Sequence, residues 1–366
     1  MVDRISNLPD ELLFHILSFL PTEDVFVTSL VSKRWRPLRF SVTDLHFVEL
    51  RNRNTHLEPR VPRYSAFIKF VDAFILRRGI HQPIKTLRLE CYSCPVFKVE
   101  KWLKAAADCK VENLQICGPV LPCTIFSIKT LVVLKLRCVD FKGFSDVELP
   151  LLKTLHLDYV TFSKCQHFIE LLNGCPLLEN LEAKCISAAF VDDPKFTTLS
   201  KLVRADVFNL RRPLDIPMRT FCNVEFLRID QFCDVDIPIF PNLIQLELMF
   251  GRHDLKWESV LDMLNHCPQL QTFDLENPSY TADKVWPNTH VVPKCFSSQL
   301  RTCILRNFKG KESGMRFAKF VMQNSALLDT MTIFSYRHLS LEEILEMRKE
   351  LDSCPRSSAS CELLFK

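Results

Sequence analysis

The residues best suited to chemistry are Cys91 and Cys94, in the run Cys91-Tyr92-Ser93-Cys94. This spacing is typical of half a zinc site or of a redox pair. A tetrahedral zinc site needs four ligands, and neither a second Cys-x-x-Cys nor a His pair supplies the others. We therefore expect no metal. The 16 cysteines are scattered through the chain, and we predict free thiols that behave as small hydrophobic residues.

Catalytic patterns are weak in this sequence. His156 alternates with Leu155 and Leu157 and should face out from a strand, but no Ser or Cys nucleophile pairs with it in an identifiable motif. Carboxylates are abundant, yet their separation across the chain cannot be inferred from the sequence. We expect no catalytic residue and no cofactor, and an esterase or transferase is the weakest functional hypothesis.

Composition excludes several classes of partner. The net charge of +4 comes from 47 basic and 43 acidic residues that are interspersed, which argues against nucleic acid. No signal sequence opens the chain, and charges interrupt each apolar run before the roughly 18 residues that a membrane span needs. With 47% hydrophobic residues and only 7 glycines, we expect a folded intracellular protein of the nucleus or cytoplasm, with no membrane partner.

The first forty residues carry more apolar surface than they can bury. Leu8, Leu12, Ile16 and Leu20 recur every four residues, which predicts a helix that Pro21 ends. Thr22 can cap a second helix, and a third is expected near the large aromatic residue Trp35. Three short helices cannot form a self-sufficient core, so this apolar face predicts a partner.

These residues resemble a known motif. Leu8-Pro9-x-Glu11-Leu12-Leu13-x-x-Ile16-Leu17-x-x-Leu20-Pro21, followed by Val31-Ser32-Lys33-Arg34-Trp35-Arg36, closely resembles the F-box. The resemblance implies docking on a Skp-type adaptor and, through it, a cullin. Pro37 departs from the motif and should end the third helix early. The expected adaptor contacts are Leu8, Pro9, Leu12, Ile16, Leu17, Leu20, Pro21, Val25, Leu30, Val31 and Trp35. The alternative is that this helical segment only caps the following domain.

The rest of the chain is dominated by self-similarity. Apolar residues recur at i, i+3 and i+5, as in Leu131-x-x-Leu134-x-Leu136, which is a leucine-rich-repeat signature. Eight other segments share this spacing, and they begin at Ile84, Val111, Leu152, Val224, Leu243, Leu270, Leu300 and Leu328. The strand ladder is therefore expected to begin near Ile84. Longer repeats insert a helix before the strand, as at 167–173 and 258–265.

These repeats predict a curved α/β solenoid with a parallel sheet. A doubly wound α/β sheet is the competing fold. It is disfavoured because no Gly-rich phosphate loop follows a strand, and because spacings near 20 residues are short for a βαβ unit of about 30.

The C-terminal quarter carries a second resemblance. Trp286-Pro287, Phe317-Ala318-Lys319-Phe320 and Cys354-Pro355-Arg356-Ser357-Ser358 resemble the FBD domain, which accompanies F-boxes and leucine-rich repeats in a large plant family. A helix at 316–324, a strand at 328–334, a helix at 340–352 and a strand near 361–365 are predicted. This segment should form one more repeat and a terminal cap. The expected domains are an F-box (1–45), a repeat solenoid (46–285) and an FBD domain (286–366).

Together the two resemblances imply a substrate-receptor subunit of a Skp–cullin–F-box ubiquitin ligase, with no catalysis of its own. The alternative is an F-box scaffold or small-molecule receptor that degrades no target. Solvent-facing strand positions are the candidate substrate face for an unknown protein. They are Lys135, Arg137, His156, Asp158, Arg228, Asp230, Glu247 and Met249.

Overall fold

The computed structural model describes most of the chain. The described residues are 5–30, 32–49, 61–78, 82–119, 121–141, 146–188, 199–208, 216–230, 237–250, 256–276, 286–287 and 291–366. They fall into two compact units. The first unit consists of Met1–Leu178 with Ile186–Pro194, and the second of Glu179–Cys185 with Lys195–Lys366.

The first unit opens with the three predicted short helices, α1 (Asp10–Ser18), α2 (Thr22–Thr28) and α3 (Trp35–Leu38). Pro9 and Pro21 stand directly before α1 and α2, where a missing N–H costs nothing. α3 ends one residue after Pro37, as expected, and passes directly into the 3₁₀ turn η1 (Arg39–Ser41).

The prediction that Thr22 caps α2 is wrong. Pro21 takes the capping position, and no side chain caps the helix. The Thr22 hydroxyl instead accepts a hydrogen bond from the backbone N–H of His46 in the first strand.

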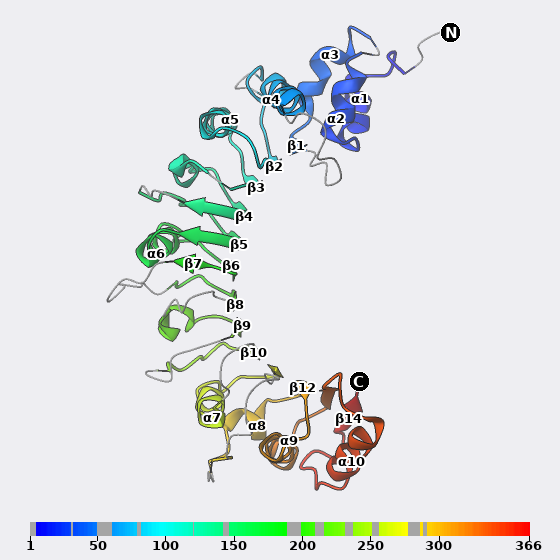
Figure 1. Cartoon of the computed structure of the whole chain (residues 1–366), viewed down its shortest axis with the longest axis vertical. Helices are drawn as coiled ribbons and strands as arrows, with labels where there is room; N and C mark the ends of the chain where they lie inside the picture. The colour runs from blue at the N-terminus through cyan, green and yellow to red at the C-terminus, as the bar shows by residue number, and fades with distance from the viewer. Residues whose placement is uncertain are drawn as a thin grey trace. The chain divides into compact units, whose positions relative to one another are not determined.

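Five strands of the first unit pair in chain order, and every pairing is parallel. They are β1 (Asp44–Val48), β2 (Thr86–Glu90), β3 (Asn113–Cys117), β4 (Val133–Phe141) and β5 (Thr154–Phe162), and the short β7 (Ser187–Ala188) also pairs with β5. The connections carry α4 (Val61–Ile75), α5 (Val96–Asp108), η2 (Cys123–Ser127) and α6 (Cys165–Asn173). Figure 1 shows α5 and α6 on one side of these strands, which leaves the opposite side uncovered by helices.

The second unit repeats the same plan. Its strands are β6 (Asn180–Lys184), β8 (Arg204–Phe208), β9 (Phe226–Ile229), β10 (Gln245–Met249), β11 (Thr272–Glu276), β12 (Thr302–Phe308), β13 (Thr330–Ser335) and β14 (Glu362–Phe365). Each pairs in parallel with the next. Its helices are η3 (Met218–Phe221), α7 (Trp257–Asn265), α8 (Lys294–Ser298), α9 (Glu312–Asn324) and α10 (Leu341–Asp352).

The repeat spacing explains this architecture. Leu131, Leu134 and Leu136 are fully buried, and Leu134 stands in register with Leu114 and Leu155 of the adjacent strands. A single repeat cannot cover its apolar side, so stacking in register supplies the core. All nine predicted segments form strands, which confirms the α/β class and the parallel leucine-rich-repeat sheet.

The expectation that the strand ladder begins near Ile84 is wrong. β1 precedes it and pairs with β2 from Asp44↔Thr86 to Val48↔Glu90. Its core residues, Val42, Leu45 and Phe47, have the repeat spacing i, i+3, i+5 but lie across the boundary assigned to the F-box. We keep the three-domain division as a proposal, with its first boundary placed before β1.

The C-terminal elements match the prediction. α9, β13, α10 and β14 follow in the expected order, and β14 pairs with β13 from Thr330↔Glu362 to Ile333↔Phe365. Ser340 and Glu343 form a capping box that starts α10. The last strand therefore covers the edge of β13, as a terminal cap should.

The prediction of free thiols fails at one pair. Cys91 and Cys94 form a disulfide that closes the turn between β2 and α5. The Glu49 carboxylate accepts hydrogen bonds from the backbone N–H groups of Tyr92 and Ser93 in this turn. Glu49 also brings one carboxylate oxygen within 4.8 Å of both sulfur atoms. Thirteen other cysteines are free thiols in the part of the chain described.

Among the described helices, none is both long enough and apolar enough to cross a bilayer.

Candidate functional site

α1 and the residue that follows it, Phe19, present apolar side chains on two different faces. Leu13 and Leu17 point inward and are fully buried. On the outer face, Leu12 and Phe19 remain 49% and 73% exposed, and Ile16 lies between them at 38%. The inner pair builds the core of the small helical module, so the outer three form an apolar stripe that nothing in the described chain covers.

Three of the predicted adaptor contacts lie in the core of the helical module. Leu17 and Val25 are fully buried and Trp35 is 3% exposed, so in the chain by itself their side chains pack inside the module. The Trp35 indole N–H donates to the Ser6 hydroxyl at 2.7 Å. This bond joins the start of α3 to the segment before α1. In the chain by itself these residues support the apolar stripe from the core.

The other predicted contacts lie nearer the surface. Leu8 and Leu20 are half-buried, while Pro9, Pro21 and Leu30 are exposed. Val31 lies outside the described residues. Ile5, Phe14, Phe19 and Val27 are exposed apolar residues that the sequence reasoning missed. Phe19 follows Ile16 by three residues, so helical periodicity could have identified it.

The helical module is built into the first unit. Arg78, at the end of α4, is buried and donates to the backbone carbonyls of Phe40 and Val42, both at 2.6 Å. Burial lowers the pKa of its guanidinium. Phe26 of α2 packs against Phe74 of α4 in an aromatic cluster that also includes Phe47 and Phe70.

The outward side of the strands holds the predicted substrate face. In the first unit Lys135 stands in register with His156, and Arg137 with Asp158. The Arg137 guanidinium lies 3.2 Å from the Asp158 carboxylate. All four alternate with buried core residues of β4 and β5, so the structure brings them together on one surface as expected.

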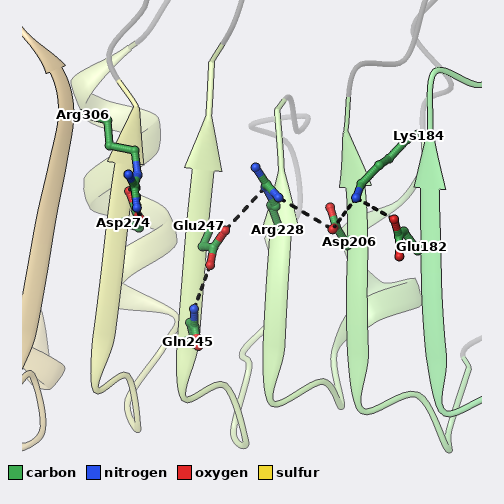
Figure 2. A network of polar contacts seen from close by, with 8 residues as sticks. All are labelled: Glu182, Lys184, Asp206, Arg228, Gln245, Glu247, Asp274 and Arg306. Carbon is green, nitrogen blue, oxygen red and sulfur yellow. Dashed lines mark hydrogen bonds and ion pairs between the residues drawn. The ribbon is translucent and has the colours of Figure 1, made fainter. Parts of the chain in front are cut away.

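In the second unit the outward side carries a ladder of charged side chains (Figure 2). The Arg228 guanidinium lies between two carboxylates, 3.8 Å from Asp206 and 3.4 Å from Glu247. The Lys184 ammonium lies 2.6 Å from Glu182 and 3.3 Å from Asp206. Burial alone would lower the pKa of Lys184, but the hydrogen bonds and charges of these two carboxylates outweigh it, and the pKa is raised.

A second pair extends this polar surface on β11 and β12. Arg306 donates two hydrogen bonds to Asp274 through Nε and Nη2, at 2.9 and 2.8 Å to the same oxygen, and Asp274 is 4% exposed. The hydrogen bond to Asp274 is the main cause of the raised pKa of Arg306.

The sequence reasoning identified only part of this ladder. Arg228 and Glu247 belong to it, and Met249 is half-buried beside it. Asp230 is buried, at 7% exposed, against the expectation that it faces solvent. Lys184, Asp206, Asp274 and Arg306 were missed. They alternate with core residues like the predicted ones, so the strand pattern could have identified them.

Comparison with protein families matches three segments of the chain. The F-box domain matches residues 5–38, and the FBD family matches residues 288–333. A repeat family described as "FBD-associated F-box protein At5g56370, LRR repeats" matches residues 99–192. These segments correspond to the helical module, to the part of the strand ladder that includes β3 to β7, and to the region from α8 to β13.

Whole-chain relatives agree with the segment matches. The chain is 27% identical to the Arabidopsis thaliana F-box/FBD/LRR-repeat protein At1g78750, over 100% of this chain and 96% of the relative. It is 29% identical to the F-box/FBD/LRR-repeat protein At5g56420 of the same plant, over 99% of each chain. A solved leucine-rich-repeat protein of Leptospira interrogans aligns at 15% identity over 91% of this chain and 86% of that one, with a TM-score of 0.38. The resemblance to plant F-box/FBD/leucine-rich-repeat proteins is confirmed.

Proposed function

We propose that this chain, which combines F-box, leucine-rich-repeat and FBD segments like its plant relatives, is the substrate-receptor subunit of a Skp–cullin–F-box ubiquitin ligase. The F-box would dock on a Skp-type adaptor and so reach a cullin. The outward strand surfaces would bind a protein substrate that is still unidentified. An intracellular location, in the nucleus or the cytoplasm, follows from the same family resemblance.

The observation that carries this proposal is the exposed stripe of Leu12, Ile16 and Phe19 within the F-box match. Protein interfaces depend on a few apolar anchors that become buried on binding. The core-facing side of α1 is filled by Leu13 and Leu17, so the stripe has no role in the core of its own module. Leu30, 76% exposed after α2, adds to the apolar surface of the same module.

The proposed role is non-catalytic. Ubiquitin transfer would be performed by a conjugating enzyme that another subunit recruits, and this chain would supply proximity. Holding a substrate lysine beside that enzyme raises its effective concentration and removes much of the entropic cost of a bimolecular encounter. We propose neither nucleic acid nor membrane as a partner.

The adaptor interaction is tested by a pull-down with a purified Skp-type adaptor. Replacing Leu12 and Phe19 together by Ser should weaken adaptor binding at least about tenfold, because two apolar anchors are lost. The matched control is the Leu341→Ser/Leu345→Ser variant, in which two exposed leucines of α10 are changed. Equal adaptor capture by the wild type and by the Leu12/Phe19 variant, with an unchanged melting temperature, would contradict the proposal.

A second measurement separates a receptor from a scaffold or a small-molecule receptor. Affinity capture of the chain under proteasome inhibition identifies proteins held on its repeats. A substrate of the ligase accumulates when the chain is removed and is ubiquitinated when it is restored. A captured protein whose level and ubiquitination do not change would favour the scaffold.

A further inference from the structure

The central row of outward side chains in the first unit carries no carboxylate. Parallel pairing places one residue from each of five adjacent strands in register along this row. The five, which we call the cationic row, are His46, Arg88, Gln115, Lys135 and His156. Each lies between two buried residues of its own strand, so its side chain faces away from the core.

Two carboxylates lie beside the row, and neither of them is paired with Arg88 or Lys135. Glu90 lies 3.9 Å from His46, and Asp158 lies 3.2 Å from Arg137, which is outside the row. Among the described residues, Arg88 and Lys135 form neither a hydrogen bond nor an ion pair through their side chains. Two positive charges on this surface are therefore not paired with any carboxylate of the described residues.

The second unit shows the opposite arrangement. Arg306 pairs with Asp274, and Arg228 and Lys184 share the carboxylates around them (Figure 2). Those three cations are neutralised within the ladder, at the cost of the side-chain freedom that each pair removes. The cationic row keeps its charge available, which is what complementarity to an external anion requires.

We propose that the cationic row binds an extended acidic segment of a protein substrate, with Asp or Glu carboxylates paired to Arg88 and Lys135. The term substrate rests on the proposed function, whereas the binding of an acidic segment does not. Gln115 stands between the two cations and offers both a donor and an acceptor to the backbone of the bound segment.

The dimensions of the row suit a peptide. Adjacent strands lie about 4.8 Å apart, so Arg88 and Lys135, two strands apart, are separated by about 10 Å. An extended peptide presents a side chain to one face about every 6.6 Å. Two acidic side chains on the same face of the peptide therefore fall within reach of two long, flexible cations.

The experiment uses the full chain and a fluorescein-labelled peptide of eight glutamates, followed by anisotropy at low and at physiological salt. The wild type should bind the peptide, and binding should weaken as salt rises, because the contacts are exposed. The Arg88→Gln/Lys135→Gln variant should bind roughly fivefold more weakly, since exposed ion pairs are individually weak. The Lys104→Gln/Arg316→Gln variant is the matched control, because it loses the same charge at helix positions paired with Glu100 and Glu312.

Three results would overturn the inference. One is that the wild type does not bind the glutamate peptide. Another is an equal loss of binding in the two double variants, which would assign the effect to net charge. The third is tighter binding of a labelled single-stranded oligonucleotide that competes with the peptide, which would assign the row to nucleic acid.

Adaptor capture by the same variants keeps the two proposals distinct. Both double variants leave the F-box stripe intact and should capture the adaptor normally. Peptide binding without adaptor capture would contradict only the ligase role, and adaptor capture without peptide binding would contradict only the cationic row.

Discussion

The Thr22 hydroxyl accepts a hydrogen bond of 2.8 Å from the backbone N–H of His46. Thr22 opens α2 of the F-box module, and His46 lies in β1, the first strand of the repeat ladder. The bond therefore joins two segments that the sequence assigns to different domains. The bond gives the His46 N–H of β1 an acceptor in the helical module instead of in a neighbouring strand.

Replacing Thr22 by Val should reduce the free energy of unfolding by about 1 kcal/mol, because the His46 N–H loses its acceptor. Chemical denaturation followed by circular dichroism measures this change. Thr28→Val is the matched control in the same helix, since its hydroxyl donates to the Val25 carbonyl three residues earlier, within α2 itself. An equal effect of the two substitutions would mean that the contact between α2 and β1 adds no more to the free energy of unfolding than a bond within the helix does.

Deleting residues 1–43 should lower the melting temperature of the repeats, because the helical module is packed into the first unit. The deletion removes the carbonyls of Phe40 and Val42 that Arg78 binds, and it removes Phe26, which packs on Phe70 and Phe74. A buried guanidinium that loses two of its acceptors is costly. A cooperative transition at an unchanged temperature would show that the module is independent.

Truncation after Pro355 should promote aggregation. It removes β14, and with it every backbone partner that β13 has on that edge, including the bond from the Lys366 N–H to the Ile333 carbonyl. An uncovered parallel edge offers a template for pairing with another chain. Light scattering and the melting temperature test this. A monomeric truncated protein with an unchanged melting temperature would favour a partner-binding tail over a cap.

The Asp274–Arg306 pair gives a prediction for the charged ladder. Arg306→Gln should destabilise the second unit by about 1–3 kcal/mol, because the buried carboxylate of Asp274 would lose the guanidinium that it binds. Adding Asp274→Asn should restore part of this loss, since the uncompensated charge is then removed. Denaturant titration of the single and double variants measures the coupling, and strictly additive effects would contradict it.

Thiol reactivity should follow burial. Burial raises the pKa of Cys175 to about 12 and that of Cys295 to about 12, and it also raises the pKa values of Cys267 and Cys303. At pH 8 a thiol with a pKa near 12 is ionised in only about one molecule in ten thousand, and the thiolate is the nucleophile.

Alkylation with iodoacetamide at pH 8 should therefore modify the exposed Cys138 before these four, even though the pKa of Cys138 is also raised by burial. Mass spectrometry of the native protein gives the order of modification. Early alkylation of Cys303 in the folded state would show that its strand opens readily.

Much of the fold could be read from the sequence, because its signals are local. The spacing i, i+3, i+5 predicts strands at Leu131–Leu136 and at eight other places, and each forms. The spacing did not predict β8, because Ala205 stands at its second apolar position in place of leucine. Ala205 is nevertheless buried, because the neighbouring strands stack against β8, and a small side chain does not indicate such burial in the sequence.

Some features of the candidate sites could likewise be predicted from the sequence, and others could not. The sequence by itself determined the helical F-box segment, the repeat spacing and the alternation of outward residues, since each follows from helix or strand periodicity. Only the tertiary structure decided that Leu17, Val25 and Trp35 fill a core while Leu12 and Phe19 stay exposed. It also decided which outward charges pair, because partners such as Asp274 and Arg306 meet through strand register across 32 residues of sequence.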